Sequence, residues 1–385
     1  MKPFRLLVIA PHCLAPPRDG ASLRAIEITR GFADREVECL FVGKNGSLSF
    51  ISEQAHEHES FAFSENKWKP ALKSLIQGSH YLAEKHISAE WLDRLDSIIQ
   101  EFQPDGYYLH FLWTYPKVSP LLGDKPIWID THNFDPEWWN NLSSHCASPL
   151  KRKIFNNNTQ NIHRTLETLP TNCSLVHVSD RDSKAYRELL PDIKHLVLPN
   201  GCKVQPRETN PSYETSVKHV YFLGLLSIQM SQDALELFSE HFFPTLKDHC
   251  QVHILGSRPS AKIKKLCRKN AWRLHSDLED EKLKEITSTM HFAILPFNYS
   301  AGSKLKLLDA CGRGIPVLTT KHGTVGHKHL PESVYISNDP CEWLKTLQLK
   351  SLSKASIDSL TEYAQKFSWD QLTGEFVTSQ FSKTS

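Results

Sequence analysis

The chain has 385 residues, of which 40% are hydrophobic and 23% charged, and its net charge at pH 7 is +2. This length suffices for two ordinary α/β domains, and the nearly neutral charge excludes a general attraction to nucleic acid. Nine cysteines occur without a Cys-x-x-Cys pair or a zinc spacing, so we expect reduced core thiols and a cytoplasmic protein.

The first half of the chain alternates apolar runs with amphipathic stretches, which is typical of an α/β domain. Leu6–Ala10 is a short apolar run ended by Pro11, which predicts a buried strand and not a signal peptide. A helix is expected from Ser22 to about Ala33, followed by a strand over Val37–Val42. This strand–loop–helix opening lacks the three-glycine fingerprint of dinucleotide-binding folds. Gly20 in its loop therefore has two possible roles, which are to let a ligand approach the backbone or only to form a tight turn.

Residues 61–77 combine aromatic and aliphatic side chains with three lysines. A basic, amphipathic stretch of this kind lies either on an anionic membrane surface or, as is more common, against its own domain. The sequence leaves both interpretations open. No stretch of the chain is long enough to span a bilayer.

Polar side chains close two consecutive predicted strands. His110 stands at the carboxyl end of the strand that begins at Gly106, and the strand Pro126–Asp130 is followed by His132 and Asn133. Ligands of open α/β sheets bind at these strand ends. A lone histidine is usually a structural polar group, whereas two at consecutive strand ends favour a ligand site.

The second half repeats the alternation after a polar, proline-containing segment, residues 206–216, that is typical of a linker. Within it, Ile294–Thr320 predicts a strand, a loop, a helix and a strand. With Ser303 as N-cap, Lys304 and Lys306 fall in the first helical turn, where each cation costs about 0.3–1 kcal/mol beside the positive end of the helix dipole. A bound phosphate would reverse this effect, because free backbone N–H groups and the ammonium could then both hold the anion.

Asp309 follows Lys306 by three residues and therefore lies on the same helix face. A carboxylate there could accept hydrogen bonds from the diol of a ribose. The alternative is that both lysines extend to water and that Asp309 simply pairs with Lys306.

Taken in their order and spacing, the motifs resemble those of the retaining, nucleotide-sugar-dependent glycosyltransferases of family four. The resemblance covers most of the chain, and the motifs that carry it in the first half are Pro16-Pro17-x-x-Gly20, Arg24, Asp130-x-His132-Asn133, Val178-Ser179 and Pro199-Asn200-Gly201. In the second half they are Phe222-x-Gly224, Leu255-Gly256-x-x-Pro259, the run from Gly302 to Ala310, Gly314-x-Pro316-Val317 and Phe367-Ser368-Trp369.

This resemblance implies an α/β fold of the GT-B architecture, in which two Rossmann-like domains face each other across a cleft and the C-terminal helix returns to the first domain. We therefore expect an acceptor-side domain over residues 1–205, the linker 206–216, a nucleotide-sugar-binding domain over residues 217–366, and a C-terminal helix over residues 367–385.

The resemblance also implies roles for single residues. His110 would face the transferred sugar and, together with Lys306, would act in catalysis. The donor-binding residues would be Gly20, Gly224, Gly256, Leu278, Gly302, Ser303, Lys304, Lys306 and Asp309, with Lys306 on the diphosphate and Asp309 on the ribose. The acceptor-side candidates are Asp19, Arg24, His132 and Asn133. Neither a metal nor another cofactor would be needed, because the helix dipole and lysine charge stabilise the leaving diphosphate.

The implied reaction moves a sugar from a nucleoside-diphosphate sugar to a glycan or lipid-linked glycan acceptor, with retention of configuration, in surface polysaccharide or glycoconjugate assembly. Nucleic acid would not be a partner, and the inner face of the membrane is a candidate for peripheral contact. Three departures from the family pattern keep a non-catalytic binding subunit as an alternative: Ala301 replaces a common glutamate, Asp309 is shorter than the usual glutamate, and Leu225–Gln229 lacks a basic residue. A nucleotide-sugar epimerase of the same fold is a second alternative.

Overall fold

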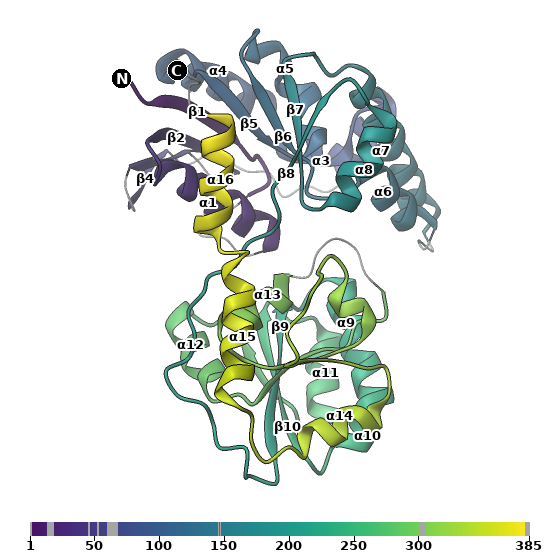
Figure 1. Ribbon diagram of the computed structural model, residues 1–385. Helices are drawn as coiled ribbons and strands as arrows, with labels where there is room; N and C mark the ends of the chain where they lie inside the picture. Colours follow the sequence, from purple (N-terminus) through teal and green to yellow (C-terminus); the bar gives the residue numbers. More distant parts are fainter. Residues whose placement is uncertain are drawn as a thin grey trace. The chain divides into compact units, whose positions relative to one another are not determined.

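A computed structural model describes residues 2–13, 19–44, 47–51, 54–59, 68–144, 146, 148–299 and 305–381, with the backbone alone for residues 45–59 where they are described. The chain divides into two compact units (Figure 1). Residues up to Pro199 form the first unit together with the segment from Leu372 onward, and Asn200–Gln371 form the second. Both units are α/β, as expected.

The first unit is built on an eight-stranded sheet with the strand order β4-β3-β2-β1-β5-β6-β7-β8. The parallel strands are β1 (Phe4–Ile9), β2 (Val37–Val42), β5 (Gly106–His110), β6 (Ile127–Asp130), β7 (Cys173–His177) and β8 (Lys194–Val197). An antiparallel pair, β3 (Ser47–Ile51) and β4 (Gln54–Glu59), extends one edge. Because helices cover both faces of such a sheet, its central strands are apolar throughout.

The helices of the first unit are α1 (Gly20–Ala33), α2 (Trp68–Gln77), α3 (Tyr81–His86), α4 (Ala89–Phe102), α5 (Tyr115–Leu122), α6 (Asp135–Ser144), α7 (Pro149–Glu167), α8 (Asp180–Leu189) and most of α16 (Trp369–Gln380). Helix α1 begins two residues earlier than expected, because the Asp19 carboxylate accepts the Ser22 N–H at 2.8 Å and so caps the helix.

The C-terminal helix packs on the first unit, as the resemblance implied. Phe376 of α16 stacks on Phe32 of α1 with ring centroids 5.3 Å apart, and Phe381 stacks on Phe4 of β1 at 5.2 Å. Figure 1 shows α16 beside α1. Burying aromatic rings in offset or stacked pairs contributes beyond the area that they remove from water, so this contact holds the end of the chain in place.

The second unit has a six-stranded parallel sheet in the order β11-β10-β9-β12-β13-β14, which is the Rossmann order. Its strands are β9 (Lys218–Leu225), β10 (Cys250–Ser257), β11 (Arg273–Ser276), β12 (Phe292–Leu295), β13 (Val317–Thr319) and β14 (Val334–Ile336). Its helices are α9 (Gln229–Leu237), α10 (Phe243–Leu246), α11 (Ala261–Lys269), α12 (Asp280–Ser288), α13 (Leu305–Gly312), α14 (Pro340–Leu347) and α15 (Lys354–Gln365).

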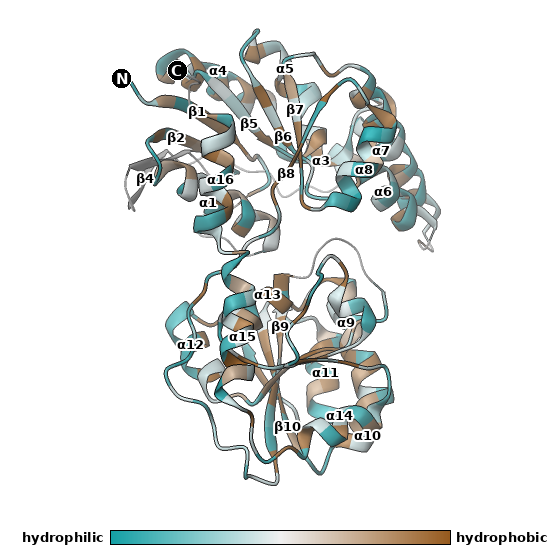
Figure 2. Cartoon of the chain, viewed as in Figure 1, coloured by the Kyte–Doolittle hydropathy of each residue, from teal (hydrophilic) through white to brown (hydrophobic). Residues whose placement is uncertain are grey.

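Each unit has its own hydrophobic core, centred on the sheet. Figure 2 shows apolar residues along the strands and hydrophilic ones on outer helices such as α12. The cysteines expected in the core are buried, namely Cys13, Cys39, Cys173 and Cys250. No helix within the described ranges is both long and apolar enough to cross a membrane.

Candidate functional site

The strand order of the second sheet reverses between β9 and β12, and ligands of open α/β sheets bind at such points. Gly224 and Gly256 lie opposite each other in register at the carboxyl ends of β9 and β10. A Cβ on Gly256, where φ is +149°, would lie 1.8 Å from the Gly224 carbonyl oxygen, and a Cβ on Gly224 would lie 2.5 Å from Cε of Lys306. Gly256 therefore requires glycine, because backbone atoms occupy the space of a side chain, whereas a side chain at position 224 would displace the end of Lys306.

Lys306 in the first turn of α13 extends to this edge. Its Nζ lies 5.8 Å from the ring centroids of both Phe222 and Phe297. Burial lowers the pKa of the ammonium from its usual 10.5 to about 8, while the Asp309 carboxylate acts in the opposite direction. Across the described part of the chain, no carboxylate forms an ion pair with Lys306. A desolvated cation without a paired carboxylate is electrostatically suited to an anionic ligand.

Asp309 is paired with Arg313 one turn further along. Arg313 Nε donates to Oδ2 at 3.0 Å and Nη2 donates to Oδ1 at 3.1 Å. The alternative pairing of Asp309 with Lys306 is therefore wrong, because the planar guanidinium binds both carboxylate oxygens at once. The Asp309 side chain is 34% exposed, and each oxygen keeps lone-pair capacity for a hydroxyl donor.

The remaining donor-binding candidates are only partly described. Leu278 follows β11 and packs against the core of the second unit, and the N–H of the preceding Asp277 donates to the Gly256 carbonyl at 3.0 Å. Gly302, Ser303 and Lys304, with Ala301, lie outside the described residues. The structure thus brings together Gly224, Gly256 and Lys306 at one end of one sheet, with Asp309 on the same helix as Lys306 and Leu278 two residues after the end of β11.

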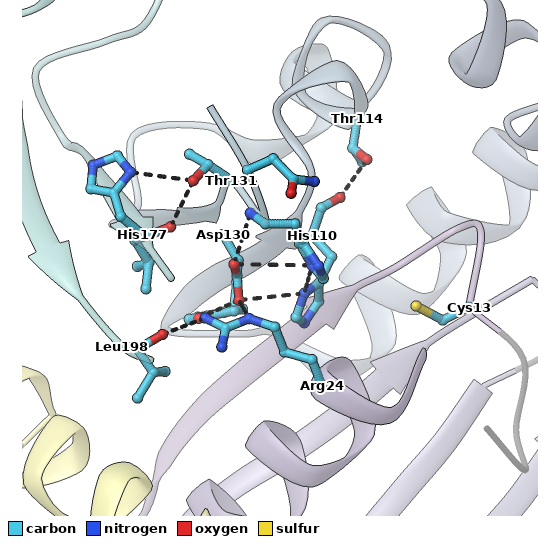
Figure 3. Close-up of polar contacts among 12 residues, drawn as sticks. Cys13, Arg24, His110, Thr114, Asp130, Thr131, His177 and Leu198 are labelled. Atoms are coloured by element: carbon cyan, nitrogen blue, oxygen red, sulfur yellow. Dashed lines mark hydrogen bonds and ion pairs between the residues drawn. The ribbon is translucent and has the colours of Figure 1, made fainter. Parts of the chain in front are cut away.

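In the first unit, Arg24 and Asp130 form an ion pair in the core. Arg24 Nε donates to Asp130 Oδ2 at 2.8 Å, and both side chains are at most 1% exposed. The other guanidinium nitrogens donate to the carbonyls of Leu198 and Pro199 at 2.8 and 3.0 Å. Figure 3 shows Arg24 and His110 converging on Asp130. Through these bonds Arg24 connects α1 with β6 and with Leu198 and Pro199 at the end of the first unit. Because the Arg24 side chain is buried, the predicted contact between Arg24 and an acceptor is disfavoured.

His110 and His132 form a hydrogen-bonded pair above this ion pair. His110 Nδ1 lies 2.9 Å from His132 Nε2 and 3.7 Å from Asp130 Oδ2. Burial lowers the pKa of His110 to about 4, partly offset by the Asp130 carboxylate, and burial also lowers the pKa of His132 far below its usual value. Both rings are therefore neutral at pH 7.

The other candidates of the first unit lie at the same end of its sheet. The donor-binding candidate Gly20 is the exposed first residue of α1, and the acceptor-side candidate Asp19 uses its carboxylate to cap that helix. Asn133 is half-buried and its carbonyl accepts from the Tyr186 hydroxyl at 3.3 Å. The expected roles of these residues toward a ligand stay predictions.

His12 was not among the predicted residues. Its ring meets the Phe111 ring edge-on with centroids 4.4 Å apart and lies 6.2 Å from the His132 ring. The feature of the sequence that could have identified His12 is its position just after strand β1, since polar residues that follow parallel strands gather at one edge of the sheet.

His110, Asp130 and His132 offer ligand atoms within 4.8 Å of one another, which is compact enough for a metal ion. Asp130 is already neutralised by the Arg24 guanidinium at 2.8 Å. A divalent cation would have to share that buried carboxylate with a fixed positive charge, which is electrostatically unfavourable. This cluster is therefore poorly suited to a metal.

A comparison with protein families and a comparison with solved structures both found matches to this chain. Residues 217–347 match the family described as Glycosyl transferases group 1. The second unit thus contains a group 1 glycosyltransferase domain. The chain has the GT-B fold. Sucrose-phosphate synthase from Thermosynechococcus elongatus superposes with a TM-score of 0.70 at 12% identity, over 99% of this chain and 100% of that one.

Further GT-B structures cover the chain as completely. WaaG, a glycosyltransferase involved in lipopolysaccharide biosynthesis, has a TM-score of 0.66 at 12% identity, over 98% of this chain and 100% of that chain. HepE of Anabaena in complex with UDP and glucose has a TM-score of 0.62 at 12% identity, with the same coverage. No curated protein sequence matches the chain. Likeness at this identity establishes the fold and leaves the reaction to be inferred from the site.

Proposed function

We propose that this GT-B chain is a retaining glycosyltransferase of family four. It transfers a sugar from a nucleoside-diphosphate sugar to a glycan or lipid-linked glycan acceptor, in cytoplasmic assembly of surface polysaccharide or glycoconjugate. The observation that carries the proposal is Lys306, a desolvated ammonium at the reversal point of the second sheet, inside the group 1 glycosyltransferase match.

A bound diphosphate would supply the anionic partner that the Lys306 ammonium lacks among the described residues. The Lys306 ammonium would donate charge-assisted hydrogen bonds to a phosphate oxygen, and Gly224 leaves room for the lysine to lie against the strand end. As the bond to the sugar breaks, negative charge grows on the leaving diphosphate. A fixed cation with little surrounding water stabilises that charge without reorganisation, so no metal is required for this step.

Two further residues have proposed roles, each considered within its own unit. Asp309, oriented by the Arg313 guanidinium, would accept hydrogen bonds from the ribose diol. His110, at the end of β5, would face the transferred sugar. Since burial lowers its pKa to about 4, His110 would act as a neutral hydrogen-bonding group and not as an acid.

One observation favours the non-catalytic subunit as a second candidate. Both oxygens of Asp309 are bound by Arg313, at 3.0 and 3.1 Å, which is also what a structural ion pair on a helix surface would show. A subunit of that kind would retain the fold and would bind a partner enzyme or a glycan without turnover.

Thermal unfolding with a panel of nucleotides tests the proposal and separates these candidates. We expect one of UDP, GDP, ADP, CMP and TDP, or one of their common sugar conjugates, to raise the melting temperature. A ligand at a hundred times its Kd stabilises the folded state by about 2.7 kcal/mol. UDP is the first choice, because HepE was crystallised with it. If none of these compounds shifts the transition, the proposal fails in favour of the non-catalytic subunit.

Peripheral contact with the inner face of the membrane is the last part of the proposal, and helix α2 supports it. Trp68, Leu72 and Ile76 are 73%, 62% and 75% exposed, and their four-residue spacing places them on one helix face. The neighbouring Lys69 is exposed as well, and Lys73 is 53% exposed and forms an ion pair with Glu84 at 2.8 Å. An apolar stripe flanked by lysines suits the interface of an anionic bilayer, where each basic residue contributes about 1 kcal/mol. Residues 61–67 of the predicted amphipathic stretch lie outside the described ranges.

We expect the protein to sediment with vesicles that contain phosphatidylglycerol and to remain in solution with pure phosphatidylcholine vesicles. Replacing all three exposed residues, as Trp68→Gln, Leu72→Gln and Ile76→Gln, should abolish most of this binding. The matched control replaces three exposed apolar residues elsewhere, namely Leu189, Val197 and Ile336, which are 44%, 37% and 44% exposed. Equal sedimentation of the two triple variants would exclude α2 as the contact.

A further inference from the structure

The hydrogen bond between His110 and His132 can be formed in two ways. Nδ1 of His110 and Nε2 of His132 lie 2.9 Å apart, and one proton occupies the space between them. If His110 carries that proton, its own Nε2 is a bare acceptor. If His132 carries it, Nε2 of His110 must be protonated, because each neutral ring holds one proton. The choice therefore decides what His110 offers to a ligand.

The surroundings favour the proton on His110. Asp130 Oδ2 lies 3.7 Å from His110 Nδ1, whereas Asp130 Oδ1 lies 4.0 Å from His132 Nε2. A proton carried by Nδ1 of His110 is thus nearer to the carboxylate charge than one carried by Nε2 of His132, and the carboxylate therefore stabilises the first arrangement more.

The second ring nitrogens point to the same tautomer. Nε2 of His110 is buried and has no hydrogen-bond partner in the described part of the chain. A buried N–H without an acceptor is rarer in proteins than an acceptor without a donor. His132 is 8% exposed and His110 is 0% exposed, so this tautomer places the second N–H of the pair on the less buried ring.

His132 is held in place at a conformational cost. Its φ is +58° and that of Phe111 is +68°, a region that residues other than glycine seldom adopt. In this conformation the two rings stack with centroids 3.9 Å apart and planes 8° from parallel. The His132 N–H also donates to Asp130 Oδ1 at 3.3 Å. Strained backbone of this kind persists at positions where the side-chain geometry is used.

We propose that His132 is a positioning residue that, together with Asp130, holds His110 in the tautomer protonated at Nδ1. Nε2 of His110 is then a bare acceptor that receives a hydrogen bond from a hydroxyl group of the bound sugar. An unpartnered acceptor in the interior is costly, and a ligand O–H would satisfy it. The identity of the ligand rests on the proposed function, whereas the tautomer does not.

The tautomer can be measured directly on the full chain labelled with ¹⁵N-histidine. Two-bond ¹H–¹⁵N spectra at neutral pH should show His110 protonated at Nδ1 and bare at Nε2, with its signals assigned by their loss in His110→Gln. His132→Phe keeps a ring to stack on Phe111 but removes the acceptor, so the spectra should show a mixture of tautomers. Turnover should fall about tenfold, as for one lost hydrogen bond in the transition state, with KM for the donor little changed. In His132→Gln, the amide oxygen can again accept from Nδ1 and should restore the single tautomer.

A second histidine pair supplies the matched control. His177 Nε2 lies 2.9 Å from His195 Nδ1, so His195→Phe removes an equivalent hydrogen bond and should leave the His110 signals unchanged. Protonation of His110 at Nε2 in the native chain, or an unaltered tautomer in His132→Phe, would overturn the proposal. Addition of UDP-glucose should shift the Nε2 signal. If UDP-glucose binds in a Lys306-dependent manner without that shift, the hydroxyl contact is refuted while the donor site stands.

Discussion

Replacing Lys306 by methionine is expected to weaken nucleoside diphosphate binding about 10- to 100-fold, since a charge-assisted hydrogen bond contributes about 1.5–3 kcal/mol. Methionine keeps an unbranched stem that can pack between Phe222 and Phe297, the rings that now flank the ammonium. The substitution therefore removes the charge with little change in volume. Isothermal titration with the nucleotide identified in the panel measures the effect.

The same substitution should stabilise the protein without ligand. Burial lowers the pKa of Lys306 from 10.5 to about 8, so the unfolded chain binds more protons than the folded chain between these two pH values. Stability then rises with pH across that window, and the penalty for the buried charge is fully present below pH 8. We expect the melting temperature of Lys306→Met to exceed that of the native chain at pH 7, and the difference to shrink toward pH 10.

A substitution that weakens nucleotide binding but stabilises the protein without ligand identifies a residue that is retained for binding although it lowers stability. Lys264 on α11 is exposed, and Lys264→Met is the matched control that should alter neither quantity. Unchanged nucleotide affinity in Lys306→Met would refute the phosphate contact, whatever happens to stability.

The sequence predicted the elements whose pattern is local. The apolar run Leu6–Ala10 overlaps strand β1 (Phe4–Ile9), and Val37–Val42 is strand β2. These outcomes depend on residues within a few positions of one another, so the periodicity of apolar residues suffices to predict the strands.

The strand pair β3 and β4 was not predicted, because its second strand reads Gln54-Ala55-His56-Glu57-His58-Glu59 and lacks the apolar alternation that signals a strand. Contacts between residues that are far apart in the sequence could not be predicted either. Arg24 and Asp130 are 106 residues apart, and nothing local marks them as partners. For Asp309, both Lys306 and Arg313 were at helical spacing. Sequence alone could not show that Lys306 extends toward Gly224 and leaves the carboxylate to Arg313.

The buried pair of Arg24 and Asp130 should be the most sensitive point of the first unit. Asp130→Asn leaves the Arg24 guanidinium in the core without a counter-charge, and breaking a buried ion pair in this way costs about 3–5 kcal/mol. For a unit of this size each kcal/mol lowers the melting temperature by about 2–4 °C, so a drop of roughly 10 °C is expected in calorimetry.

The exposed pair of Arg181 and Glu137 provides the control, because it has the same chemistry without the burial. Its nitrogen–oxygen distance is 2.7 Å and its side chains are 64% and 47% exposed, so Glu137→Gln should cost less than about 1 kcal/mol. Equal melting temperatures for Asp130→Asn and Glu137→Gln would contradict the structural role of Asp130. The double variant Arg24→Met, Asp130→Leu should recover only part of the loss. It removes both charges, but the carbonyls of Leu198 and Pro199 would still lose the donors that Arg24 now supplies.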